Sequence, residues 1–264
     1  METVEQTVAR YLTAVDAALP GFVEMLYLTG SVVLGAYQPG HSDIDTVIVT
    51  ARRPTPGDLA ALAAVHADLP PKPPLGGVYL DRETFRQQPA DARVVPFAVD
   101  GEFRADQPCG DLNPVLWLLL ARYGRAVRGP AVPDLGLTVD ADGLRRFNLD
   151  NLRTYWQPLA AAARAAVDAV PDDTPAEQTR VGAGGVAWVV LGPARLHFTL
   201  AHTDVVSKAG AAAYLAEILP AYGPLADRAL RWRRDEPVTF TVADIRAAAD
   251  SVDAVVADAL RRWG

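Results

Sequence analysis

The chain has 264 residues, a net charge of −7 and a single cysteine, Cys109. An acidic chain is not expected to bind nucleic acid in general, which usually needs a basic patch, and one cysteine cannot form an intrachain disulfide. Polar residues interrupt every apolar stretch before it reaches the roughly 20 residues of a membrane span. The N-terminal segment METVEQTVARYL also lacks the continuous apolar core of a signal peptide, so we expect a cytoplasmic protein.

The first half of the chain alternates between helix and strand patterns. Apolar residues over 4–19 recur at helical spacing, and Pro20-Gly21 ends that helix. Further helices are expected over 56–69 and 113–123, and residues 124–130 are expected to form a turn. Strands are expected over 22–28, 46–50, 77–80 and 94–99. This alternation predicts an α/β-type mixed sheet.

Beyond residue 134 the strand patterns disappear and helical patterns replace them. Helices are expected over 144–170, 183–201, 208–219 and 241–263. The segment 129–138, which is rich in proline and glycine, is the predicted boundary. We therefore expect an α+β protein in which a sheet domain over residues 1–133 precedes an all-helical bundle over residues 134–264.

Two short motifs carry the candidate chemistry. The predicted strand over 22–28 leads into Gly30-Ser31, where glycine lets the backbone approach a phosphate and the serine hydroxyl can bond its oxygen. Asp43 and Asp45 lie two residues apart where the next strand begins, and the alternation of a strand places both carboxylates on one face. Two such oxygen ligands suit Mg²⁺ bound together with substrate phosphates. Singly, these residues are also typical of turns and solvated strand edges.

Together, the two motifs resemble those of a known family. The segment YLTGSVVLGAYQPGHSDIDTVIV resembles the nucleotidyltransferase superfamily, and within it the aminoglycoside adenylyltransferases that modify streptomycin and spectinomycin. The resemblance implies that Gly30, Ser31 and Ser42 bind ATP, while Asp43 and Asp45 bind Mg²⁺. It further implies an enzyme that transfers AMP from ATP to a hydroxyl group on a small-molecule acceptor.

The helical half extends this resemblance. The segments LHFTLA and VSKAGAAAY are similar to the helical domain of the same enzymes, which implies that Lys208 binds the ATP phosphates. A solvated lysine at a helix start is the alternative. Asn151 and Tyr155 share one face at α-helical spacing, and Trp188 offers an aromatic face, so all three are candidates for the acceptor pocket. Packing roles for these residues remain open.

The expected catalytic base is missing from the third predicted strand. In the resembled enzymes a glutamate there takes the proton from the acceptor hydroxyl, but this chain has Gly76 and Gly77 at that position. Asp81 is the candidate replacement, although it is also well placed to cap a helix that begins at Arg82. The alternative hypothesis is therefore a nucleotide- or ligand-binding homologue that has lost efficient catalysis. The segment 180–188 also lacks carboxylates that would bind a cationic drug.

Overall fold

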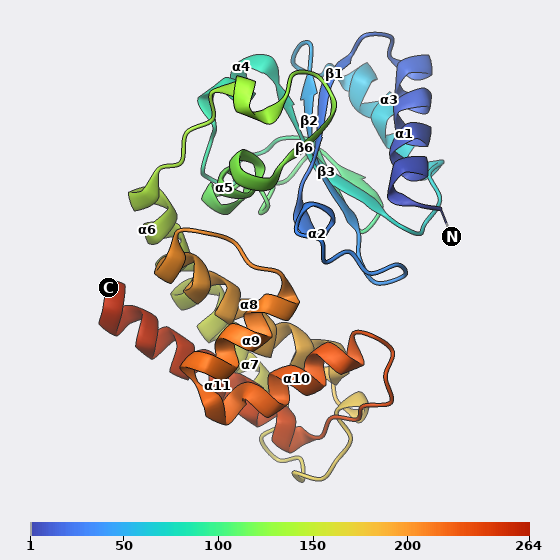
Figure 1. Cartoon of the computed structure of the whole chain (residues 1–264). Coiled ribbons are helices and arrows are strands. Elements are labelled where there is room, and N and C mark those ends of the chain that lie inside the picture. The colour runs from blue at the N-terminus through green and yellow to red at the C-terminus, as the bar shows by residue number, and fades with distance from the viewer. Residues whose placement is uncertain (1) are drawn as a thin grey trace. The chain divides into compact units, whose positions relative to one another are not determined.

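The computed structural model of the protein describes residues 2–264, and the chain divides into two compact units after Asp140 (Figure 1). The sequence predicted this division after residue 133. The proline- and glycine-rich segment instead belongs to the first unit, where it forms a 3-10 helix over Val132–Leu135. Val132 is buried in the core of that unit, and the Thr138 N–H donates a 3.1 Å hydrogen bond to the side-chain oxygen of Gln88. These contacts attach residues 132–138 to the first unit, so the division lies after residue 140 instead of after residue 133.

Residues 2–140 form a six-stranded sheet with the strand order β5-β4-β3-β2-β1-β6. Strands β2 and β3 are parallel, and the other neighbouring pairs are antiparallel, which confirms the predicted mixed sheet. The strands are β1 (Val23–Leu28), β2 (Ile44–Thr50), β3 (Leu75–Asp81), β4 (Phe97–Val99), β5 (Glu102–Arg104) and β6 (Arg125–Arg128). The α-helices are α1 (Val4–Ala18), α2 (Gly30–Val33), α3 (Pro56–Ala67), α4 (Arg82–Gln87) and α5 (Pro114–Tyr123).

Helices lie on both faces of the sheet (Figure 1), and each face has its own apolar core. On one face, residues of α1 and α3 pack against Ile44 and Ile48 of β2. On the other face, residues of α4 and α5 pack against Val47 and Val49. Because side chains alternate along a strand, Asp45 lies on the face that α5 covers.

Strand β6 lies where the sequence predicted a turn. It pairs antiparallel with β1, and Ala126 lies opposite Tyr27. The short run Arg125–Arg128 carries two arginines and is flanked by Gly124 and Gly129, so its local pattern resembles that of a turn. Pairing with β1, which is distant in sequence, makes it the edge strand of the sheet.

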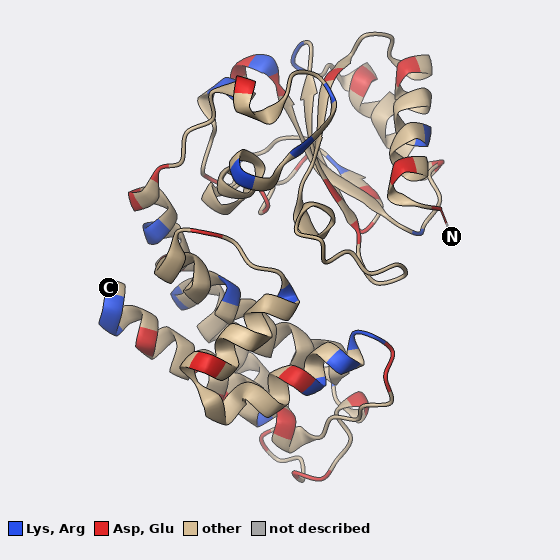
Figure 2. Ribbon diagram, in the orientation of Figure 1, with Lys and Arg blue, Asp and Glu red and all other residues tan. Residues whose placement is uncertain are grey.

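Residues 141–264 form the helical unit, which confirms an α+β protein with a C-terminal helical region. Its core consists mainly of alanine and valine side chains. Both basic and acidic residues occur along the helices of this unit (Figure 2). Within residues 2–264, no helix is both long and apolar enough to cross a membrane. The helical segments are α6 (Ala141–Asn151), the π-helix Leu152–Trp156, α7 (Gln157–Ala165), the 3-10 helix Ala176–Gln178, α8 (Gly182–His202), α9 (Lys208–Ile218), the 3-10 helix Pro220–Tyr222, α10 (Gly223–Trp232) and α11 (Val242–Trp263).

Candidate functional site

The turn after β1 brings Gly30 directly against Asp45. Gly30 has a φ of +62°, in the left-handed region that favours glycine. A Cβ atom placed on Gly30 would overlap the carboxylate of Asp45. The turn is held to β2 by a 2.9 Å hydrogen bond from the Thr29 N–H to the Asp45 carbonyl oxygen. Glycine is therefore required here both for backbone conformation and for space beside the carboxylate.

Ser31 and Ser42 differ in how their hydroxyl groups are used. Among residues 2–264, the buried Ser31 Oγ has no hydrogen-bond partner. A buried hydroxyl without a protein partner is costly, and such groups are typical of ligand-binding positions. The Ser42 Oγ instead accepts a 3.0 Å hydrogen bond from the Gln38 N–H, which closes the loop between α2 and β2. Ser31 is thus the hydroxyl suited to a phosphate oxygen.

Asp43 and Asp45 lie where β2 begins, close to the Gly30 turn. The intervening Ile44 is fully buried in the core on the α1 side, as the alternation predicted. Burial and the negative charges of Asp43 and Glu5 raise the pKa of Tyr37. No group of three or more His, Cys, Asp or Glu side chains in residues 2–264 is arranged to hold a metal ion. This donor set fits Mg²⁺, which binds through one or two carboxylates and takes further oxygens from water and phosphates.

The register of β2 and β3 distinguishes the two glycines that replace the expected glutamate. Asp45 lies beside Gly76, and Thr46 lies beside Gly77. Paired residues of parallel strands face the same side, so Gly76 shares the face of Asp45 and Gly77 does not. A Cβ on Gly77, whose φ is +157°, would overlap the Thr46 side chain, whereas a Cβ on Gly76 would lie 3.2 Å from the Ala98 carbonyl oxygen. The position without an acid is therefore Gly76.

The structure contradicts a catalytic role for Asp81 at this site. Asp81 lies beside Thr50, at the other end of β3 from Gly76. Five residues of strand correspond to about 17 Å at about 3.3 Å per residue. Its carboxylate caps α4, accepting hydrogen bonds from the N–H groups of Glu83 and Thr84, both 3.0 Å, and 2.7 Å from the Thr84 hydroxyl. These bonds help to lower the pKa of Asp81 against the opposing effect of burial. The predicted capping role is confirmed.

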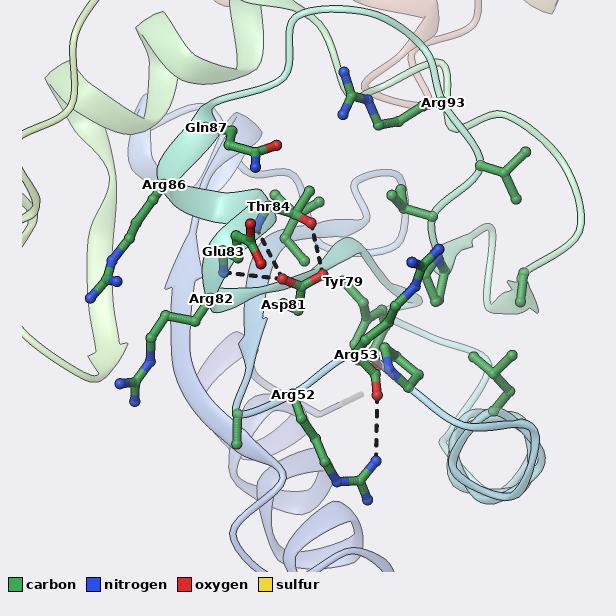
Figure 3. A pocket seen from close by; sticks show the side chains of 18 residues that line it. Arg52, Arg53, Tyr79, Asp81, Arg82, Glu83, Thr84, Arg86, Gln87 and Arg93 are labelled. Carbon is green, nitrogen blue, oxygen red and sulfur yellow. Dashed lines mark hydrogen bonds between the residues drawn. The ribbon is translucent and has the colours of Figure 1, made fainter.

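A cavity of about 770 Å³ lies beside Asp81, at the end of β3 that is distant from Asp45 (Figure 3). Five arginines line it, but three of them form ion pairs: Arg52 with Asp58, Arg82 with Glu24 and Arg93 with Asp91. Much of the positive charge is thereby neutralised by the protein itself. Neither the Gly30 turn nor Asp43 and Asp45 line this cavity.

Asp111 is an acidic residue that the sequence analysis did not single out and whose carboxyl is affected by the charge of Asp43. Asp111 is exposed by its accessible surface, but desolvation of its carboxyl by the surrounding atoms and the negative charges of Asp43 and Asp100 raise its pKa. Asp111 lies far from both residues in sequence, and its neighbours Gly110 and Asn113 are typical of an ordinary loop before a helix. No local pattern therefore indicates that the charge of Asp43 acts on it.

In the helical unit, three of the four candidate residues lie together. Trp188 Nε1 donates a 3.2 Å hydrogen bond to the Tyr155 hydroxyl. The Lys208 Nζ lies 5.8 Å from the centroid of a Trp188 ring, a cation–π distance. The side chains of Tyr155 and Trp188 are 45% and 44% exposed, so Trp188 is not the core residue that a packing role requires. The cluster offers an aromatic surface with one cation.

A π-helix lies between Asn151 and the end of the Tyr155-Trp156 pair, where the sequence predicted a continuous α-helix. The predicted helix over 144–170 is interrupted by the π-helix Leu152–Trp156, in which the Gln157 N–H donates to the Leu152 carbonyl oxygen. π-helical hydrogen bonds join residues five apart, so the segment that carries Tyr155 is not the regular α-helix that was expected. Asn151 remains at the C-terminal end of α6.

Comparisons with known proteins agree with this geometry. Residues 8–74 match the family model of the nucleotidyltransferase domain, which includes the Gly30 turn and both aspartates. The structure is similar to the crystal structure of spectinomycin adenyltransferase AAD(9) from Enterococcus faecialis with ATP and spectinomycin. The TM-score is 0.66 at 12% sequence identity, and the match covers 97% of this chain and 100% of the other. No curated protein matches this chain in sequence. Residues 8–74 therefore match a nucleotidyltransferase domain, and the chain as a whole shares the fold of this spectinomycin adenyltransferase.

Proposed function

We propose that this protein is a Mg²⁺-dependent nucleotidyltransferase that transfers AMP from ATP to a hydroxyl group of a small molecule. The observation that carries the proposal is the contact between Gly30 and the Asp45 carboxylate. It joins a glycine turn, which a phosphate can approach, to a potential metal ligand. The unpartnered hydroxyl of Ser31 supports the same use of the turn.

Each candidate residue has a distinct role in this proposal. Gly30 and Ser31 bind the triphosphate, Ser42 shapes the loop that leads to β2, and Asp43 and Asp45 hold Mg²⁺. The bound ion would neutralise phosphate charge and help to align the attacking and leaving oxygens. Lys208 is assigned to the phosphates by resemblance, since a lysine is a compact positive charge on a long side chain.

The acceptor is proposed to contact the aromatic cluster of Tyr155 and Trp188. Their rings provide a flat, partly exposed surface, and the Tyr155 hydroxyl provides a polar group. The start of α8, from Gly182 to Trp188, carries no carboxylate to bind a cationic drug. We therefore expect weak or absent modification of streptomycin and spectinomycin, which incubation with labelled ATP and each drug will measure. Efficient turnover of either drug would contradict this assignment of the acceptor surface.

A second candidate function is nucleotide binding without efficient transfer. The observation that favours it is Gly76, which leaves the position beside Asp45 on β3 without an acid. Both functions require the same nucleotide site, and they differ only in the transfer step. Release of pyrophosphate from ATP in the presence of an acceptor therefore separates them.

The metal site is tested by changing Asp43 and Asp45 together to asparagine. This change keeps side-chain size but removes two negative charges, so Mg²⁺-dependent ATP binding should be lost while the fold is retained. Calorimetric titration with ATP, with and without Mg²⁺, measures the binding, and circular dichroism checks the fold. A double variant that binds Mg²⁺ and ATP as tightly as the wild type would refute the site.

A further inference from the structure

The cavity beside Asp81, which has no part in the proposed transfer reaction, has the size of a small-molecule site. Its volume of about 770 Å³ lies within the range of roughly 300–1,000 Å³ that is typical of such sites. Three segments supply most of its lining: residues 51–54 in the loop after β2, residues 79–87 of β3 and α4, and residues 93–96 before β4. All three belong to the first unit.

The sheet fixes these three segments to one another. Asp81 lies beside Thr50, the residue from which the loop after β2 begins. The Thr50 hydroxyl donates a 2.9 Å hydrogen bond to the Arg52 carbonyl oxygen, which fixes the start of that loop. The Tyr79 N–H donates a 2.8 Å hydrogen bond to the Pro96 carbonyl oxygen, which joins β3 to the segment before β4. The cavity is therefore formed before any ligand binds, as is usual for small-molecule sites.

The charge of the lining is mainly positive. Five arginines and two acidic residues, Asp81 and Glu83, line the cavity. Both carboxylate oxygens of Asp81 already accept hydrogen bonds at the start of α4. Arg53 contributes to lowering the pKa of Asp81, but it forms no ion pair with Asp81 or with any other acid among residues 2–264. The charge of Arg53 is therefore not neutralised by a paired acid.

The lining side chains differ in where they point (Figure 3). Arg53, from the loop after β2, and Arg93, from the segment before β4, lie on different sides of the space next to Asp81. The amide of Gln87, on α4, points toward the same space. The remaining arginines of the lining point away from it: Arg52, Arg82 and Arg86. Two guanidinium groups and one amide thus face a common space.

The ion pair of Arg93 leaves most of its guanidinium free to bind a ligand. Arg93 pairs with Asp91, and the two side chains are 42% and 67% exposed. Ion pairs that are exposed to this degree contribute little to stability. The hydrogen bond to Asp91 uses one nitrogen, Nη2, whereas a guanidinium has five N–H donors. A bound anion can therefore contact Arg93 without breaking this pair.

The lining also indicates which class of anion fits. A guanidinium group binds the oxygens of a phosphate or a carboxylate through parallel hydrogen bonds. A phosphomonoester carries a charge of about −1.5 to −2 near pH 7, so it matches two arginines better than a single carboxylate does. Apolar side chains line the same cavity, and one of them, Val94, is 57% exposed. They suit an apolar group on the ester. The apolar lining residues are Leu59, Leu80, Val94, Val95 and Pro96.

We propose that this cavity binds a phosphomonoester that carries an apolar group. Arg53 and Arg93 hold the phosphate, and the Gln87 amide supplies a neutral hydrogen-bond donor. The site lies at the end of β3 opposite Gly76, the residue that is beside Asp45. It is therefore a second site, distinct from the proposed nucleotide site, and it does not depend on the proposed function.

Calorimetric titration of the full chain with phenyl phosphate tests this site. We expect the wild type to bind phenyl phosphate with a dissociation constant below about 1 mM. Arg53→Gln and Arg93→Gln should each weaken binding about tenfold or more, because each removes charge-assisted hydrogen bonds. Inorganic phosphate, which has no apolar group, should bind more weakly than phenyl phosphate.

Two arginines serve as matched controls. Arg86 lines the cavity but points away from the shared space, so Arg86→Gln should bind phenyl phosphate as the wild type does. Arg104 pairs with Glu102 two residues away, with exposures of 41% and 71% that resemble those of the Arg93 pair, and it does not line the cavity. Arg104→Gln should also retain the wild-type affinity. Circular dichroism checks that every variant is folded.

Several results would overturn the inference. These are no binding of phenyl phosphate by the wild type at millimolar concentration, or wild-type affinity in Arg53→Gln. An equal loss in all four variants would indicate attraction by overall charge instead of a site. Inorganic phosphate that binds as tightly as phenyl phosphate would contradict the assigned class of ligand.

A competition experiment separates this site from the nucleotide site. Saturating ATP with Mg²⁺ should not displace phenyl phosphate, and displacement would place the ester in the nucleotide site and refute a second site. If the wild type binds phenyl phosphate as expected but does not bind ATP with Mg²⁺, the inference stands and the proposed function fails. If it binds ATP with Mg²⁺ but not phenyl phosphate, the inference fails and the proposed function stands.

Discussion

Replacing Gly30 by alanine should damage both the fold and the nucleotide site, and Gly35 offers a matched control. Gly30 and Gly35 have almost the same backbone conformation, with φ of +62° and +64°. Alanine in this left-handed region costs about 1–2 kcal/mol, so both variants should lose stability by this amount. A Cβ on Gly35 has no neighbouring atom within 4 Å, whereas a Cβ on Gly30 overlaps the Asp45 carboxylate.

The difference between the two variants measures the contact with Asp45. Overpacking of this kind typically costs a further 1–3 kcal/mol, roughly, so Gly30→Ala should be the less stable variant by about that amount. The Asp45 side chain must also rotate away from the turn. We therefore expect affinity for ATP with Mg²⁺ to fall by at least about tenfold, or about 1.4 kcal/mol, in Gly30→Ala alone.

Urea unfolding followed by circular dichroism measures the stabilities, and calorimetry measures the affinities. Because the chain has two units, the transition of the first unit is the one to compare. Equal stability and equal ATP affinity in Gly30→Ala and Gly35→Ala would refute the close contact between the turn and Asp45. Loss of ATP affinity in both variants would show that backbone conformation, rather than the Asp45 contact, determines binding.

Two further predictions concern His66 and Lys208. Burial lowers the pKa of His66 from 6.5 to about 4, so the folded protein favours the neutral imidazole. The stabilisation is therefore fully present above pH 6.5, and the free energy of unfolding should fall by about 3 kcal/mol as the pH decreases to 4. Urea unfolding at several pH values measures this loss of stability. The loss should be absent in His66→Gln, and the same pH dependence in that variant would show that His66 does not cause it. Lys208→Met should lower the affinity for ATP with Mg²⁺ by about tenfold or more if the lysine binds phosphate. If its only role is the contact with Trp188, calorimetry should show an unchanged affinity for ATP. Urea unfolding should then show that the free energy of unfolding falls by about 0.5–1 kcal/mol.

The local elements and the positions of the two aspartates were predictable because short-range patterns specify them. Helix α1 was expected over 4–19 and is observed over Val4–Ala18, because apolar spacing and the following Pro20-Gly21 lie within a few residues of each other. The same holds for β1, which leads into the Gly30 turn, and for Asp43 and Asp45 at the start of β2. In each case the deciding residues are neighbours in the chain.

Local patterns predicted less where an element depends on a distant partner. Strand β6 resembled a turn because its two arginines and flanking glycines are typical of loops, and only pairing with β1 makes it a strand. Helix α10 was not predicted, although its apolar face packs Leu225, Ala226 and Ala229 into the helical core. The π-helix at Leu152–Trp156 interrupts the continuous α-helix that was expected over 144–170.

The sequence by itself determined the glycine turn after β1, the pair of aspartates and the order of sheet region and helical region. Tertiary structure alone decided that Gly76, and not Gly77, lies beside Asp45, and that Asp81 caps α4 at the other end of β3. It also placed Lys208 beside Trp188. The physical reason is that strand register and contacts between distant segments depend on how whole faces pack, and a one-residue shift of register would reverse every side chain of β3.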